Sequence, residues 1–178
     1  MKRNYLILFG ALITTGTILL LSSCKSIPKG AIAVKPFNTN KYLGKWFEIA
    51  RFDFSFERNL KNTTAEYSLN DNGSLKVVNR GYNYKKKKPV EAIGKAKFVG
   101  AHNEAKLKVS FFGPFYAGYN VIAIDQNYQY ALVAGKDLNY LWILSREKSI
   151  PDNIKKEYLQ KASEIGFNIS NLIWVEQD

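Results

Sequence analysis

The sequence predicts an all-β, antiparallel domain that carries one α-helix near its C-terminal end. Short runs rich in aromatic and β-branched residues follow one another between residues 44 and 145, separated by Gly, Pro, Asn and Asp. The spacing of apolar residues changes from two to helical only after residue 150, and one more strand-like run follows. This order of elements fits a β-barrel or a two-sheet sandwich with an appended helix.

The first strand is expected at residues 44–52, where Gly44 opens an aromatic and apolar run. Because side chains alternate along a strand, its residues divide between two faces: Trp46, Glu48, Ala50 and Phe52 on one, and Phe47, Ile49 and Arg51 on the other. Each face is mostly apolar and carries one charge. That pattern suits a strand that lines a cavity, but an ordinary strand with a buried tryptophan shows it too.

Seven further strands are expected before the helix. They fall at residues 63–69, 75–82, 90–99, 105–111, 119–124, 128–134 and 140–145. The dipeptide Asn72-Gly73 favours a hairpin between the first two of these, because Asn and Gly tolerate positive φ. Short strands joined by turns of this kind are typical of antiparallel proteins.

A single helix is expected after Pro151, which suits a first helical turn. Apolar residues then recur at helical spacing: Ile154, Tyr158, Ala162 and Ile165. Gly166 is well placed to end the helix, and a last short strand is expected at residues 171–175.

Residues 1–23 are typical of a bacterial lipoprotein signal peptide. Two basic residues precede an apolar stretch without charges, residues 5–21. The stretch is long, so a membrane anchor that is not cleaved is the alternative. The sequence Leu21-Ser22-Ser23-Cys24 resembles a lipobox, which predicts cleavage before Cys24 and lipidation of that cysteine.

The residues after the expected cleavage site indicate where the protein goes. Lys25, and not aspartate, follows Cys24, which is the only cysteine. By resemblance to lipoprotein sorting in double-membraned bacteria, this implies the outer membrane, and we expect a domain that faces the periplasm. Residues 24–41 lack periodicity and are expected to form a lipidated tether. Residues 42–178 are expected to form one domain.

The net charge of +11 concerns partners more than fold. Removal of residues 1–23 lowers it by two, because two lysine or arginine residues lie there. Anionic lipid head groups are the polyanions expected in an envelope. We expect no nucleic-acid partner, because a secreted protein is separated from nucleic acid.

Several sequence blocks after residue 40 carry a family resemblance. They are residues 42–52, 56–58, 64–69, 78–82, 107–121, 130–133, 140–146 and 173–175. The first contains Gly44-Lys45-Trp46, a G-x-W pattern, and the blocks together resemble the lipocalins, especially the bacterial outer-membrane lipoprotein lipocalins. The resemblance implies an eight-stranded up-and-down antiparallel barrel with a C-terminal helix and a final short strand.

The resemblance also implies a closed base for the barrel. In lipocalins, the G-x-W tryptophan packs there against an arginine from the last barrel strand. Gly44, Trp46 and Arg146 stand at the matching positions of this sequence. We expect a structural role for them, with the arginine held over the indole by a cation–π interaction.

The barrel interior would provide the ligand cavity. Its candidate residues are Glu48, Ala50, Phe52, Tyr67, Val77, Asn79, Phe111, Tyr119, Tyr130 and Trp142. For each residue, plain packing in the core or on the outside is the alternative. Together they would form an aromatic and aliphatic pocket with few polar groups, which suits an acyl chain.

A basic rim is expected at the open end. In an up-and-down barrel alternate loops share one end, which would gather Arg58, Lys61, Lys85, Lys86, Lys87, Lys88 and Lys136 around the opening. The alternative is a solvated lysine loop without a partner. We expect the rim to attract anionic head groups.

The sequence predicts a binding protein and not an enzyme. His102 is the only histidine and falls in an expected turn, and Cys24 is assigned to the anchor, which leaves little for nucleophilic catalysis or a histidine-based zinc site. We expect no cofactor and no metal. The predicted function is binding or transport of fatty acids, lysophospholipids or phospholipids in the bacterial envelope.

Two other functions remain as alternatives. One is a surface lipoprotein that binds polyanions by charge alone, and the other is a lipid-modifying enzyme. The expected partners are a fatty acid or phospholipid-type ligand and the membrane, reached through the N-terminal lipid anchor. The sequence leaves open whether the protein forms a homodimer.

Replacement of Cys24 by serine tests the lipidation site. Serine lacks the thiol that would carry the lipid. Cys24→Ser should therefore yield protein without acyl chains and with residues 1–23 retained. Mass spectrometry of the purified N-terminal peptide measures both changes. If the unchanged protein also retains residues 1–23 and lacks acyl chains, the alternative of an uncleaved membrane anchor is correct.

Overall fold

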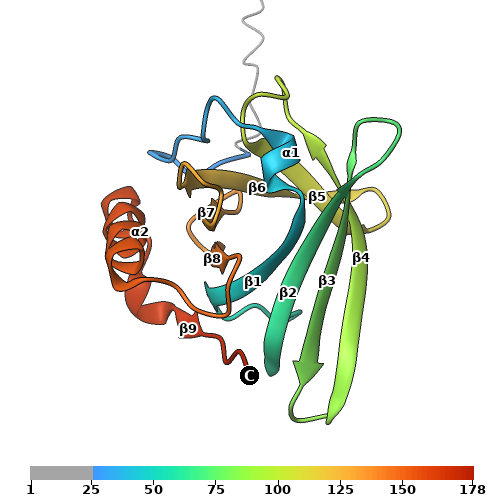
Figure 1. The fold of residues 1–178 in the computed structure, drawn as a ribbon, viewed down its shortest axis with the longest axis vertical. Coiled ribbons are helices and arrows are strands. Elements are labelled where there is room, and N and C mark those ends of the chain that lie inside the picture. Colours follow the sequence, from blue (N-terminus) through green and yellow to red (C-terminus); the bar gives the residue numbers. More distant parts are fainter. Residues whose placement is uncertain (1–25) are drawn as a thin grey trace, which may run out of the picture.

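The computed structural model describes residues 26–178. Cys24 and the expected signal peptide, residues 1–23, lie outside the described residues. Figure 1 shows a barrel with one helix packed against its outside.

Within residues 26–178 a single antiparallel sheet carries the fold. Its barrel strands are β1 (Gly44–Arg51), β2 (Leu60–Leu69), β3 (Leu75–Asn83), β4 (Lys88–Phe98), β5 (Lys106–Phe112), β6 (Phe115–Ile124), β7 (Tyr130–Ala134) and β8 (Leu141–Ser145). Each strand pairs with the next, and β1 pairs with both β2 and β8, so the sheet closes on itself. The predicted up-and-down barrel is confirmed, and the two-sheet sandwich is wrong.

The remaining elements lie at the ends of the chain. They are the short helix α1 (Thr39–Tyr42), the helix α2 (Asp152–Ile165), the 3-10 turn η1 (Ile169–Asn171) and the short strand β9 (Ile173–Trp174). Gly166 ends α2 with a φ of 105°, a left-handed conformation that favours glycine. Strand β9 pairs with β1 where β2 has already diverged from it. No helix among the described residues is long and apolar enough to cross a membrane.

Two apolar clusters lie on opposite faces of the barrel wall. The inner cluster includes Trp46, Leu75, Leu107 and Val133. The outer cluster packs α2 against β6, β7, β8 and β1, and Tyr158 of the helix is buried in it. The hydroxyl of Tyr158 donates a hydrogen bond to the carbonyl of Tyr130 at 2.9 Å.

Residues 26–38 pack against the barrel. Ala33 and Phe37 are only 6% and 5% exposed, and the amide of Val34 donates to the carbonyl of Val121 at 2.9 Å. The expectation of a tether through residue 41 is therefore wrong for these residues. The apolar side chains scattered in this segment show no helical or strand period, so sequence patterning could not reveal the packing.

Trp46 and Arg146 close the barrel beside α1. The guanidinium carbon of Arg146 lies 3.8 Å from the centroid of the Trp46 ring, and the fully buried indole donates to the carbonyl of Tyr42 at 2.8 Å. Arg146 also donates hydrogen bonds to five carbonyls, those of Lys41, Tyr42, Leu43, Lys45 and Tyr128. Gly44 has a φ of 91°, which explains why glycine begins β1.

Substitutions at Trp46 and Arg146 should have coupled effects on stability. Trp46→Ala leaves a large cavity and should lower the free energy of unfolding by about 3–5 kcal/mol. Arg146→Ala should cost less, and the double variant should cost less than the sum, because the two side chains touch. Urea unfolding of the three variants measures this coupling. Strictly additive losses would show that the cation–π contact contributes nothing to stability.

Candidate functional site

The interior of the barrel holds most of the residues that the sequence assigned to a cavity. The inward positions follow the strand register, in which Ala65, Asn79 and Ala92 form one row across β2, β3 and β4. The interior residues from the predicted set are Glu48, Tyr67, Val77, Asn79, Phe111, Tyr119 and Trp142. Ala65 and Ala92 of this row have small side chains. Ala92 is exposed although it faces inward, so the interior is open to solvent there.

A β-bulge in β1 corrects the prediction for two residues. Glu48 is opposite Leu144, but Ala50 is opposite Ile143, so the register shifts by one between Glu48 and Ala50. Ala50 and Phe52 therefore pack in the outer cluster beneath α2. The expectation that they line the cavity is wrong, because strict alternation does not hold across a bulge.

The same bulge turns Arg51 into the barrel. Sequence alternation placed this residue on the outer face, yet it is only 3% exposed and its guanidinium contacts Glu48. Glu48, three positions before Arg51, carries the opposite charge. This spacing is the one signal in the sequence that could have indicated the pairing.

Tyr130 is the third residue that the structure places outside. Ala131 and Val133 of β7 belong to the inner cluster, whereas Tyr130 packs against the outer one. The prediction was wrong because all five residues of β7 are apolar or aromatic, which gives no alternation from which to read the inward face.

Three tyrosines form the floor of the interior above Trp46. The hydroxyl of Tyr119 lies 2.6 Å from that of Tyr42 and 2.7 Å from that of Tyr67, which joins β6, α1 and β2 across the barrel. Burial raises the pKa of all three phenols above the usual value, so they stay protonated at neutral pH. The floor is apolar except for this chain of hydroxyls.

A polar cluster lies on the β1 side of the interior. Arg51 donates to the Glu48 carboxylate at 2.6 Å, and Thr63 donates to the same oxygen at 3.1 Å. Arg51 also donates to the carbonyls of Glu57 and Leu60, at 2.8 Å and 3.0 Å. Because those carbonyls belong to the start of β2 and the loop before it, the buried arginine holds that loop to the barrel.

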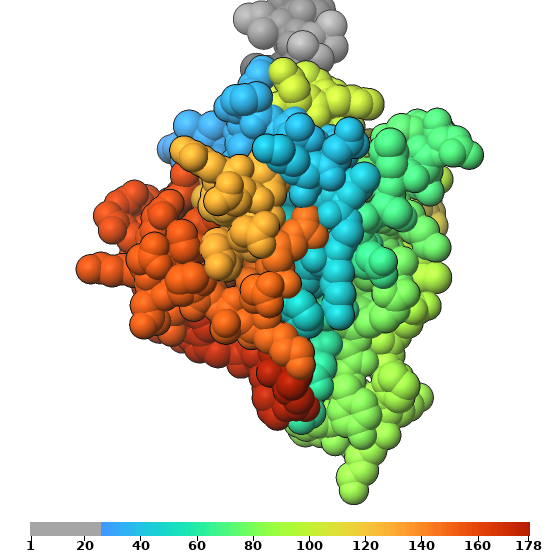
Figure 2. All heavy atoms as spheres, in the orientation of Figure 1, coloured from blue at the N-terminus to red at the C-terminus, as the bar shows by residue number. Residues whose placement is uncertain are grey.

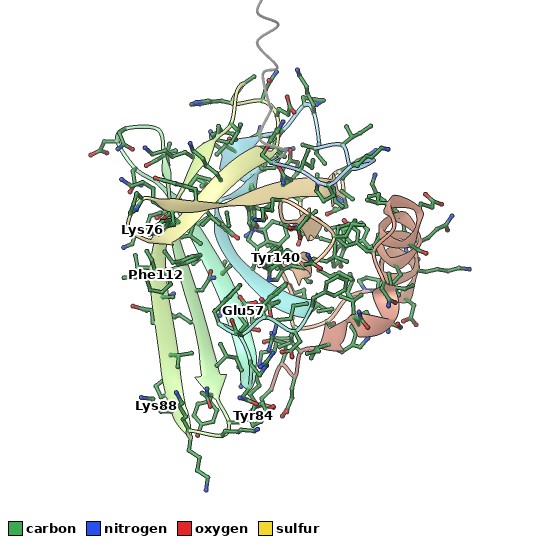
Figure 3. All side chains as sticks on the ribbon, turned by 180° about the vertical axis from the view of Figure 1, so that it is seen from behind. Glu57, Lys76, Tyr84, Lys88, Phe112 and Tyr140 are labelled. Carbon is green, nitrogen blue, oxygen red and sulfur yellow. The ribbon has the colours of Figure 1, made fainter. Side chains whose placement is uncertain are left out.

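Glu57 brings a second carboxyl to this cluster from the loop between β1 and β2 (Figure 3). Its side chain is buried and accepts a hydrogen bond from the indole nitrogen of Trp142 at 3.2 Å. Burial, together with the nearby Glu48 charge, raises the pKa of Glu57 to about 8. Glu57 is therefore mostly protonated at neutral pH, and the ion pair of Glu48 with Arg51 leaves the cluster without net charge.

Two polar atoms of the interior lack a hydrogen-bond partner among the described residues: Nε of Arg51 and Oδ1 of Asn79. Asn79 belongs to the small-residue row opposite Ala65 and Ala92. An orphaned polar atom in an otherwise apolar wall is costly unless water or a ligand satisfies it. Both atoms are buried, so a polar group could reach them only if the neighbouring side chains moved.

Two of the basic residues expected at the mouth, Arg58 and Lys61, are paired with acids. Arg58 pairs with Asp53 at 2.8 Å, and Lys61 pairs with Glu176 and Asp178, each at 2.8 Å. Both cations line a hollow of about 360 Å³ beside β9, which also includes Arg51 and Trp174. Arg58 and Lys61 are thus largely neutralised by acids that sequence reasoning could not place beside them.

The other predicted rim residues are exposed. Residues 85–87 form the turn between β3 and β4, and Lys88 begins β4. This hairpin tip projects beyond the rest of the barrel, where Tyr84 and Lys88 lie (Figures 2 and 3). Lys136 lies in the β7–β8 loop beside the backbone of Gly118. The lysine run is therefore a projecting tip, and its attraction for anionic head groups stays a prediction.

Comparison with known proteins assigns the chain to a family. A model of the lipocalin-like domain matches residues 37–177. The chain belongs to the lipocalin family. Its fold is also found in the cockroach allergen Per a 4, with a TM-score of 0.67 and 24% identity, over 86% of this chain and 96% of that one. Lipocalins are generally carriers of bound ligands and not enzymes.

Two curated relatives refine the comparison. This lipocalin is 51% identical to outer membrane lipoprotein Blc of Escherichia coli (strain K12), over 92% of this chain and 93% of the relative. It is 38% identical to temperature-induced lipocalin-1 of Arabidopsis thaliana, over 78% of each. The bacterial relatives place it at the outer membrane as a lipid-anchored protein with a ligand-binding role in the envelope.

Sequence reasoning missed three polar residues of this lipocalin's interior: Arg51, Glu57 and Thr63. Arg51 was assigned to the wrong face, and the other two were placed in a loop or strand without a role. Their roles depend on the bulge in β1 and on a loop that folds back over the interior, neither of which has a sequence period.

The raised pKa of Glu57 should make stability depend on pH. The unfolded chain releases this proton near pH 4.5, whereas the folded protein retains it to about pH 8. Glu57 therefore favours folding fully below pH 4.5, and its contribution is lost as the pH rises to 8. Relative to the unchanged protein, Glu57→Gln should gain stability between pH 5 and pH 8, by more than about 1 kcal/mol.

Urea unfolding at a series of pH values measures this gain. Glu147→Gln, at an exposed glutamate, is the control and should not change the pH profile. A constant difference between Glu57→Gln and the unchanged protein at all pH values would mean that Glu57 is ionised in the folded state.

Proposed function

We propose that this lipocalin binds fatty acids, lysophospholipids or phospholipids in its barrel and carries them within the bacterial envelope. The observation that supports the proposal is the distribution of side chains in the interior. Aromatic and aliphatic residues cover most of the wall, and the polar groups gather on the β1 side, around the Glu48–Arg51 pair.

An acyl chain suits this interior because its burial supplies most of the affinity. Each buried CH₂ contributes about 0.8 kcal/mol. The open row of Ala65, Asn79 and Ala92 offers a path along β2, β3 and β4, with Phe111 on the same wall. The tyrosine floor limits the depth that a chain can reach.

The polar cluster limits where a charged head group can lie. Glu48 is already paired with Arg51 and Glu57 is protonated, so the cluster has no net positive charge to attract an anion. A head group is therefore expected at the mouth, within reach of the lysines at residues 85–88.

The membrane forms the second part of the proposal. An acyl anchor on Cys24 would hold the barrel at the outer membrane, facing the periplasm, where its cargo is within reach. A homodimer remains a separate proposal, to be tested by the mass of the detergent-solubilised protein.

Filling the open row should weaken lipid binding. Ala92→Trp puts an indole in the space proposed for the chain and displaces at least two methylenes, which corresponds to a loss of about tenfold or more in affinity. Ile93→Trp is the matched control, because this neighbouring residue is exposed on the outer face of β4 and its replacement introduces the same indole outside the barrel. Titration with a fluorescent fatty acid measures both affinities.

Lipid extraction of the purified protein tests the proposal independently. Mass spectrometry should find fatty acid or lysolipid bound to the unchanged protein and to Ile93→Trp, and less on Ala92→Trp. Equal binding by both variants would place the ligand outside the barrel. An empty barrel that binds no added fatty acid would contradict the proposed function.

A further inference from the structure

Four exposed lysines gather on the outer face of β3, β4 and β5, away from the hairpin tip. We call them the lysine face: Lys76, Lys95, Lys97 and Lys108. In the strand register, Lys76 is directly opposite Lys95, and Lys97 is directly opposite Lys108. Like charges in directly opposed positions destabilise a sheet. The arrangement therefore has a cost that folding alone does not explain.

The nearby acids do not neutralise the lysine face. Glu66 and Glu91 on the same outer surface both bind Arg80, at 2.7 Å and 2.8 Å. None of the ion pairs formed by residues 26–178 includes a residue of the lysine face. Around Arg80, positive and negative side chains on the outer surface of the sheet are thus paired. On the lysine face, the positive charges have no acidic partner.

Apolar side chains border the lysine face. Ile93 is 56% exposed, Phe112 is 79% exposed and Tyr116 is 39% exposed. The ammonium of Lys108 lies 5.0 Å from the centroid of the Tyr116 ring. Large aromatic side chains next to lysines are typical of surfaces that lie at a membrane interface, where rings enter the head-group layer and cations meet phosphates.

We propose that the lysine face, with Ile93, Phe112 and Tyr116, docks the barrel on an anionic phospholipid bilayer. The charge of the surface is complementary to phosphate head groups, and the lipid anchor keeps the domain beside a membrane. A purely polyanionic partner such as a polysaccharide has no use for three exposed apolar side chains. This docking does not depend on the nature of the ligand in the barrel.

Docking on this face also presents a particular part of the barrel wall to the lipids. The pairing of β4 with β5 runs only from Phe98 opposite Leu107 to Lys95 opposite Ser110, so the preceding residues of β4 have no β5 partner. Gly94 still lies against Ser110 and Phe111, and β5 ends at Phe112. The apolar side chains Ile93 and Phe112 thus lie where β4 begins to extend beyond β5.

Lysine footprinting of the anchored protein tests the docking. The full chain, purified from bacterial membranes, is reconstituted into vesicles of phosphatidylcholine alone or of phosphatidylcholine with phosphatidylglycerol. Acetylation of each lysine is then followed by mass spectrometry. Anionic vesicles should slow acetylation of the lysine face at least about threefold, and high salt should remove the effect.

Lys148, Lys156 and Lys161, which are exposed at or near α2, are the internal controls and should react equally in both vesicles. Phe112→Ser should reduce the protection of the lysine face. Ile32→Ser is its matched control, because Ile32 is 81% exposed elsewhere on the surface and its replacement should have no effect.

Three results would overturn the proposal. Equal acetylation in neutral and anionic vesicles would show that the face does not meet the bilayer. Equal protection of the control lysines would show a general attraction without a docking face. Protection by soluble polyphosphate, but not by anionic vesicles, would assign the face to another polyanion. Each result is independent of lipid extraction, so docking and cargo binding can fail separately.

Discussion

The barrel depends on the pairing of β1 with strands from three parts of the chain. Its first half pairs with β2, its second half with β8, and its last residues also with β9. Closure removes the free edges that would otherwise expose unpaired backbone groups to other chains. At the start of this strand, Arg146 joins β8 to α1 and β1 through its carbonyl acceptors and its contact with Trp46. The closed base and the closed sheet therefore both depend on β1.

The bulge in β1 determines which groups enter the interior. It turns Arg51 inward beside Glu48 and sends Ala50 and Phe52 to the packing beneath α2. A buried ion pair of this kind contributes little net stability, but loss of either partner typically costs about 3–5 kcal/mol because the other charge stays buried. The pair also binds the carbonyls of the loop after β1, so a single change of register positions both the loop and the polar side of the cavity.

Charge is distributed unevenly between the inside and the outside of this lipocalin. Inside, Glu48 and Arg51 cancel and Glu57 is held protonated, which gives an interior compatible with an apolar ligand. Outside, the lysine face carries positive charge without acids to balance it. A neutral interior and a cationic outer surface are what a carrier of amphiphiles beside an anionic membrane requires.

The sequence by itself determined the antiparallel strands and the appended helix. Period-two runs and the helical spacing from Ile154 to Ile165 are local features, and local backbone geometry transmits them directly into structure. The resemblance selected a barrel over a sandwich and implied the closed base. The sequence also indicated most of the inward-facing residues, because alternation holds along regular stretches such as the one that carries Val77 and Asn79.

The tertiary structure alone decided the polar half of the site. A bulge inserts one residue without a sequence signal, so the faces of Ala50, Arg51 and Phe52 could be known only from the pairing with β8. All residues of β7 are apolar or aromatic, so the sequence did not show whether Tyr130 faces inward or outward. The neutralisation of Lys61 by Glu176 and Asp178, and the opposition of Lys97 to Lys108, arise between residues distant in sequence. Such contacts are set by strand register and by how distant parts of the chain meet in the fold. The composition of the sequence does not encode either.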